Sequence, residues 1–173
     1  AGPLRRAYVN NGGDIALHLT GTEQFRAAIA NGRLDRVRID AHSPVRGIAT
    51  SGWRGRSQSF GIADSVTVLA STAAGADAAA TLIANAVDLP ESPKVSRRPA
   101  SDLFPDSDLG DRLVTTDVAL LTRDEIDLAL MNGHRFARTC LSRGLIHAAH
   151  LTLGGETISV GTPLETLKDL THA

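Results

Sequence analysis

The amino-acid sequence predicts an α+β fold. Residues 65–71 are β-branched at their centre and predict a strand. Residues 73–87 are rich in alanine and predict a helix, which Pro90 would end. Gly154-Gly155 separates two strand-like runs and predicts a hairpin. Because strands and helices follow one another without a regular strand–helix–strand alternation, we favour a mixed α+β sheet over a doubly wound one.

The first third of the chain predicts mainly short strands. Asn11-Gly12-Gly13-Asp14 is a strong turn signal between two strand-like runs. The residues that follow the second run have the composition of a short helix, which Asn31-Gly32 would close. We therefore expect a helix at 22–31, and strands at 6–10, 15–19, 37–41 and 45–51.

Residues 88–111 contain four prolines and many charged residues, and they predict a loop or linker that is long for a compact domain. On this basis the chain divides into an N-terminal portion, residues 1–87, which contains the candidate ligand- and metal-binding residues, and a C-terminal portion. Residues 112–173 form this C-terminal portion of the same domain, made of a helix and a β-hairpin.

The C-terminal portion has a clear helix start. Thr122 and Glu125 have the spacing of a capping box, so a helix is expected to begin there and to end at Gly144, with Gly133 weakening its middle. The expected elements are a strand at 113–121, a helix at 122–143, hairpin strands at 145–153 and 156–160, and a last short helix at 163–170.

Composition narrows the class of protein. A chain of 173 residues is long enough for one domain with its own core. A formal net charge of −1 argues against a general nucleic-acid binder, and the single cysteine, Cys140, excludes an intrachain disulfide and a cysteine zinc cluster. We find neither a signal peptide nor an apolar run near the ~18 residues that span a bilayer, so we expect a cytoplasmic protein without membrane contact.

Charge is unevenly spread along the chain. Residues 1–60 hold nine arginines and four acidic residues, whereas residues 61–111 hold three basic and eight acidic residues. The basic part either faces an anionic ligand or is a solvated surface that pairs with the acidic part.

Two glycine-containing segments are candidates for a ligand site. The turn at Gly12-Gly13 lets the backbone approach a ligand closely and can cradle a phosphate, or it is an ordinary hairpin turn. The segment 49–56 combines hydroxyl groups, glycines and two arginines, which suit an anionic ligand. Its tryptophan, Trp53, either stacks on a flat ring or anchors a flexible loop in the core.

The helix at 73–87 carries a polar stripe. Asp77, Thr81 and Asn85 are spaced four residues apart, so they share one helix face. Asp77 and Thr81 offer oxygen ligands of the kind that Mg²⁺ takes. The alternative is that Asp77 simply interacts with the dipole near the helix N-terminus.

Histidine and cysteine give weaker signals. His147 and His150 are three residues apart in an expected strand, so their side chains should point to opposite faces. Spacing alone does not assemble a Ser-His-Asp triad. Cys140 lies within the expected second long helix and is better explained as a small buried residue than as a nucleophile.

Four segments, taken in order, resemble the ApbE-like superfamily, whose best-known members are FAD:protein FMN transferases. The resemblance is clearest over residues 5–87, and residues 109–112 and 144–161 are similar to the C-terminal part of an uncharacterised soluble branch. The segments are Val9-Asn10-Asn11-Gly12-Gly13-Asp14-Ile15-Ala16-Leu17, Ala49-Thr50-Ser51-Gly52, Asp64-Ser65-Val66-Thr67-Val68 and Gly75-Ala76-Asp77-Ala78-Ala79-Ala80-Thr81.

The resemblance implies an α+β flavin-transferase-like fold, FAD as the ligand and Mg²⁺ beside its pyrophosphate. It implies that Asp77 and Thr81 bind the metal ion. The residues implied to line the FAD site are Asn11, Gly12, Gly13, Asp14, Thr50, Ser51 and Gly52.

The chain departs from the family's transferases in one segment. They carry a His-Ile-Ile-Asp-Pro-type sequence before the Val-Thr-Val strand, whereas residues 56–64 contain no histidine. Attack of a threonine hydroxyl on a pyrophosphate needs a group that takes up its proton. We therefore do not expect ordinary flavin transfer, and consider instead Mg²⁺-dependent hydrolysis of FAD.

Asp64 is the catalytic candidate in that segment, where it would orient water or bind the metal ion. Its alternative role is to turn the chain into the strand at Val66. A protein that keeps the fold for assembly without binding a nucleotide is the rival interpretation.

Family members also carry a substantial N-terminal half that contributes to the site, and this chain resembles the part after it. We therefore expect a partner chain that supplies this half, or a homo-oligomer that covers an exposed sheet edge.

Overall fold

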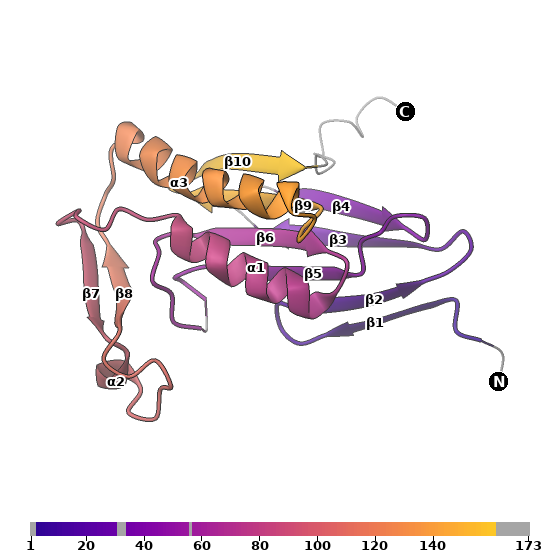
Figure 1. Ribbon diagram of the computed structural model, residues 1–173, viewed down its shortest axis with the longest axis horizontal. Coiled ribbons are helices and arrows are strands. Elements are labelled where there is room, and N and C mark those ends of the chain that lie inside the picture. The colour runs from indigo at the N-terminus through magenta and orange to yellow at the C-terminus, as the bar shows by residue number, and fades with distance from the viewer. Residues whose placement is uncertain (1–2, 31–33, 56, 162–173) are drawn as a thin grey trace.

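The computed structural model describes residues 3–30, 34–55 and 57–161 of the chain, with residues 28–30 and 34–36 described by their backbone alone. It confirms the α+β prediction: within these residues, one antiparallel sheet of six strands packs against two long helices (Figure 1). In spatial order its strands are β1 (Arg6–Asn10), β2 (Ile15–Leu19), β5 (Gly47–Ser51), β6 (Ser65–Ala70), β9 (Ala148–Leu153) and β10 (Glu156–Gly161).

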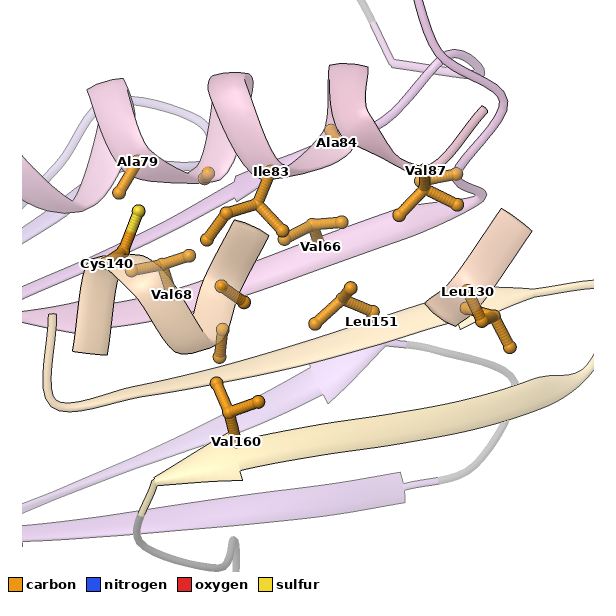
Figure 2. Packing of buried hydrophobic residues seen from close by; sticks show 14 of the residues in the cluster. Val66, Val68, Ala79, Ile83, Ala84, Val87, Leu130, Cys140, Leu151 and Val160 are labelled. Carbon is orange, nitrogen blue, oxygen red and sulfur yellow. The ribbon is translucent and has the colours of Figure 1, made fainter. Parts of the chain in front are cut away.

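Helices α1 (Ala73–Ala86) and α3 (Arg123–Ser142) cover one face of this sheet. Alternate residues of the strands point toward them, so Val66, Val68 and Leu151 meet Ile83 of α1 in a fully buried cluster (Figure 2). Gly133 allows α3 to pack closely against α1. A Cβ atom on it would lie 2.2 Å from Val87 Cγ2, so its missing side chain lets α3 pack closely on the end of α1.

Both long helices begin with side-chain caps. The Thr72 hydroxyl accepts from the Gly75 amide at the start of α1. At α3 the predicted capping box is confirmed, because Thr122 Oγ1 accepts from the Glu125 amide and Glu125 accepts from the Thr122 amide. These contacts satisfy amides that a helix start leaves without partners. Cys140 is buried in α3, as expected, and burial raises the pKa of its thiol.

The opposite face of the sheet is covered by a hairpin of β3 (Gln24–Ala30) and β4 (Leu34–Asp40). Val37 and Ile39 pack there against Leu17, Ile48 and Leu69. The helix predicted at 22–31 is therefore wrong for residues 24–30. Pairing in register from Gln24↔Asp40 to Ala30↔Leu34 outweighs the helix-forming composition, since β propensity depends on the surface a strand packs against.

A two-stranded arm projects from the core. It contains β7 (Val95–Pro99), the short helix α2 (Ala100–Leu103) and β8 (Leu113–Val118) (Figure 1). The loop predicted for 88–111 thus contains regular structure, and the strand predicted at 113–121 ends at Val118. The Thr115 amide donates to Ser59 O, which fixes the arm to the loop after β5.

The predicted helix at 163–170 lies outside the described residues. Among the helices in the described part of the chain, none combines the length and apolar character needed to cross a bilayer.

Candidate functional site

The second and third strands of the main sheet are paired over only a short stretch. β2 pairs with β5 through only two residue pairs, Ile15↔Ile48 and Ala16↔Gly47. Beyond Ile48 the end of β5 runs past the β1–β2 turn without further ladder pairing, and α1 crosses the same region with contacts to both strands. The sequence thus places a turn, a strand end and a helix around one opening.

This opening is a pocket of about 290 Å³. It brings together Asp64 and every residue that the resemblance implies for the ligand and the metal ion, and adds Gly55, from the candidate segment 49–56, and Ser57. Its described lining is Asn11, Gly12, Gly13, Asp14, Thr50, Ser51, Gly52, Gly55, Ser57, Asp64, Asp77 and Thr81.

The turn between β1 and β2 is stabilised by hydrogen bonds among its own residues. The Asn11 amide donates to Asp14 O at 2.9 Å, and the Gly12 amide donates to Asn10 Oδ1 at 2.9 Å. Gly12 has a φ of 71°, a conformation that favours glycine. Asn-Gly-Gly-Asp is therefore a hairpin turn, and its residues also form one wall of the pocket.

Gly52 is required by the close approach of two chain segments. A Cβ atom on it would lie 2.4 Å from the backbone oxygen of Asp64. The next amide, that of Trp53, donates to Ala63 O at 3.0 Å. The loop from Trp53 to Ala63 therefore closes on itself beside the pocket.

Thr50 connects the pocket to polar groups on the sheet face away from the helices. Its hydroxyl is hydrogen-bonded to that of Thr67 at 2.8 Å. Thr67 lies opposite His150 in the β6–β9 pairing, and His150 Nδ1 is 2.7 Å from Ser159 Oγ. Thr67 and His150 are both buried. The sequence did not predict this row, because it depends on the register of four neighbouring strands.

The polar stripe of α1 divides into two parts. Asn85 has a structural role, because its Oδ1 accepts from Ser59 Oγ and from the Phe60 amide. Asp77 and Thr81 are exposed, and their side chains make no hydrogen bond or ion pair within the described residues. Two oxygen donors one turn apart are thus available on the pocket wall.

Nowhere in the described chain do three or more His, Cys, Asp or Glu side chains gather into a group that could hold a metal ion. A tightly coordinating all-protein site is therefore absent from this part of the molecule. The donor set at Asp77 and Thr81 fits only a cation that takes its other ligands from water and from a bound anion, as Mg²⁺ does.

Asp64 is engaged through both carboxylate oxygens. Its Oδ2 accepts from the Gly154 amide at 2.7 Å, and its Oδ1 lies 3.2 Å from Arg54 Nε. Arg54 in turn lies over the Trp53 ring, 4.8 Å from the ring centroid. Trp53 Nε1 is buried and has no hydrogen-bond partner among the described groups. Sequence reasoning missed these contacts, because nothing in the local pattern pairs Asp64 with Gly154.

Taken together, the antiparallel sheet, the helices on one face and the glycine-lined opening define an α+β protein with a polar pocket where the pairing of β2 with β5 ends. A model of the family described as AbpE bacteria matches residues 1–159. The chain belongs to that family, which confirms the resemblance drawn from the four segments.

A second comparison finds a relative in Methanothermobacter thermautotrophicus, described as a UPF0280 protein. The two are 42% identical over 92 residues, which is 50% of this chain and 35% of the relative. The match therefore spans about a third of that relative's length.

Proposed function

We propose that the pocket binds the phosphate part of a flavin nucleotide such as FAD, or of a similar anionic ligand, with Mg²⁺ at Asp77 and Thr81. The observation that carries this proposal is that one pocket contains all the residues implied by the family resemblance. Family membership supports the relation to flavin in general terms.

The pocket walls suit phosphate oxygens. Gly12, Gly13 and Gly52 carry no side chains, so a ligand can approach the backbone. Thr50, Ser51 and Ser57 add hydroxyl donors on the same surface. The carboxylates of Asp14, Asp64 and Asp77 would repel an anion without a cation between them, which favours binding together with a divalent ion.

Asp77 and Thr81 would hold Mg²⁺ through a carboxylate and a hydroxyl oxygen. When bound, the ion would neutralise phosphate charge and polarise a phosphorus–oxygen bond. Asp14 and Asp64 are the other carboxylates on the pocket wall.

Hydrolysis of FAD to FMN and AMP is the reaction we favour over flavin transfer. Residues 57–64 contain no histidine, and none is found in the described lining. Asp64 already holds Arg54 and Gly154, so we assign it to the positioning of the pocket loop and to the orientation of water rather than to strong base chemistry.

The size of the pocket supports a site that is completed by further protein. About 290 Å³ lies at the lower end of ligand pockets, and FAD is a large ligand. We propose that a partner chain or a second copy covers the rest of the nucleotide. Native mass spectrometry tests this, and a monodisperse 18.2 kDa monomer with full FAD affinity would contradict it.

The binding proposal is tested by titrating FAD with the protein, with and without Mg²⁺, while following flavin fluorescence anisotropy. We expect Mg²⁺-dependent binding that weakens at least tenfold in Asp77→Ala and more modestly in Thr81→Ala. Asp106→Ala is the control, because Asp106 is an exposed carboxylate outside the pocket lining.

Chromatography of the same mixtures tests the reaction. FMN and AMP should appear in equal amounts and only with Mg²⁺. Mg²⁺-dependent binding without products would restrict the proposal to a binding protein. No binding by the complete assembly would favour the rival, a member that keeps the fold for assembly alone.

A further inference from the structure

A serine and a histidine meet at the opposite end of β6 from Asp64. Ser71 lies between β6 and α1, and His147 lies just before β9. Ser71 Oγ and His147 Nε2 are 2.8 Å apart. The pairing of β6 with β9 fixes this contact, because the His147 amide donates to Leu69 O at 2.8 Å.

His147 also lines a second pocket, of about 430 Å³. Its walls come from β4 and the loop after it, from the end of β6 and from the segment that joins α3 to β9, and they are mixed: an apolar part lies beside the polar side chains of Arg38, Asp40 and Ser43. The apolar part of the wall includes Val37, Ile39, Leu69, Leu141 and Ile146. Among the described residues, this pocket shares no lining residue with the glycine-lined pocket.

Ser71 stands where a strand passes into a helix. The Gly75 amide donates to Thr72 Oγ1 and the Ala76 amide donates to Thr72 O. The amides of Ala73 and Ala74 belong to the first turn of α1 and have no acceptor within the helix. A helix start of this kind favours negative charge beside it.

We propose that Ser71 and His147 form a nucleophile–base pair that hydrolyses small esters, with the apolar acyl group in the second pocket. Ser71 Oγ bonds to the ester carbonyl carbon while its proton passes to His147 Nε2. The carbon–oxygen bond to the alcohol then breaks, and the alcohol leaves with that proton. The Ala73 and Ala74 amides lie on the helix end where the negative oxygen of the intermediate would gain stabilisation.

The second half of the reaction restores the serine. Water attacks the acyl carbon of the acyl-serine and gives a proton to His147 Nε2. The acid leaves as the bond to Ser71 Oγ breaks, and His147 returns the proton to that oxygen. Overall one ester and one water give one acid and one alcohol, with no further reactant.

Two features set the expected rate. Within the described residues no carboxylate holds His147 Nδ1, and no residue other than glycine has positive φ, so Ser71 does not lie on a strained turn. The activity should therefore be slow compared with that of triad hydrolases, and visible first with activated esters.

The test combines active-site labelling with ester hydrolysis. The purified protein is treated with a fluorophosphonate probe, and the labelled site is located by peptide mass mapping. Release of p-nitrophenol is followed with p-nitrophenyl acetate and butyrate. We expect labelling at Ser71 and a preference for butyrate, because its longer chain contacts more of the apolar wall.

Substitutions distinguish a reaction at Ser71 and His147 from unspecific reaction of surface side chains. Ser71→Ala should abolish labelling, and His147→Gln should slow both reactions about tenfold or more. Ser142→Ala is the control, because Ser142 is another exposed serine and binds only a backbone oxygen.

Three results would overturn the proposal. These are an unlabelled wild-type protein, hydrolysis that persists in Ser71→Ala, or labelling of His147→Gln at the wild-type rate. Mapping the label on the wild-type protein decides the matter even if a variant fails to fold.

Discussion

The carboxylate of Asp64 and the backbone amide of Gly154 form a 2.7 Å hydrogen bond that ties the start of β6 to the β9–β10 turn. The same carboxylate pairs with Arg54 on the pocket loop. Gly154 has a φ of 57°, and a Cβ atom on it would lie 2.6 Å from Ile126 Cδ1, so this turn fits tightly against α3. Asp64 therefore joins the pocket loop to the helix-covered side of the sheet.

Removal of the Asp64 carboxylate should destabilise the fold. Asp64→Ala removes the acceptor of the Gly154 amide, which is exposed and can bind water instead, so we expect the free energy of unfolding to fall by about 0.5–1.5 kcal/mol. Asp64→Asn keeps an acceptor oxygen and should lose less. Urea unfolding of the two variants measures both values. Equal stability of Asp64→Ala and wild type would show that the contact contributes nothing to folding.

A methyl group should destabilise the fold at one pocket glycine, Gly52, and have little effect at another, Gly13. In Gly52→Ala the new Cβ meets Asp64 O at 2.4 Å, so the backbone must shift, at a cost of about 1–3 kcal/mol. In Gly13→Ala the nearest contact is 3.8 Å, an ordinary separation. Thermal unfolding should therefore show a clear loss only for Gly52→Ala. A matching loss in Gly13→Ala would mean that the turn is already under strain.

Glu125 should make stability depend on pH. The hydrogen bond from Lys94, at 2.7 Å, and then the Thr122 amide hold the pKa of this carboxyl below its ordinary 4.5. A depressed pKa means that the stabilising effect is present above pH 4.5 and is lost as pH falls through the lower, folded-state pKa.

Glu125→Gln is the test of that pH dependence, because Gln can keep the capping contact without the charge. Urea unfolding between pH 3 and 6 should show a smaller advantage of wild type over the variant as pH falls. An advantage that grows on acidification would contradict the assignment.

Asn85 should hold the loop between Gly52 and Asp64 in place. Asn85→Ala removes the acceptor for Ser59 Oγ and for the Phe60 amide, which we expect to cost about 1–3 kcal/mol. Amide exchange at Phe60 should become faster, while exchange in β9 stays close to that of wild type once the change in global stability is subtracted. Unchanged exchange at Phe60 would indicate that other contacts hold the loop.

Local patterns predicted the elements that are stabilised by nearby residues. The strand at 65–71 and the helix at 73–87 were found because β-branched residues and alanines favour those structures locally. The capping box at Thr122 involves only residues three apart, so its geometry could be inferred from spacing.

Elements that depend on distant partners were missed. β3 has a period-two pattern that its alanines hide: Phe25 and Ala27 are half-buried, whereas Gln24 and Arg26 are exposed. β7 pairs with β8 across the whole of α2 and the following turn, a relation that proline-rich composition does not reveal. Ser71 and His147 are 76 residues apart and meet only because β6 lies beside β9.

The candidate site, too, was predicted in part and missed in part. Its residue types were identified by motif, and their gathering into one pocket then followed from the fold. The engagement of Asp64 with Gly154 could not be inferred, since it requires the β9–β10 turn to reach the start of β6.

Four of the twelve described lining residues of the glycine-lined pocket are glycine, so much of its surface is main chain. Point substitutions elsewhere on the wall exchange side chains but leave those backbone groups in place. Insertion or deletion of a single residue in the β1–β2 turn would instead shift the whole row of main-chain groups relative to β5. During evolution this pocket should therefore tolerate substitution of its side chains far better than a change in the length of the β1–β2 turn. In related chains, the number of residues between the pocket segments is then a better guide to a shared site than the identity of each residue.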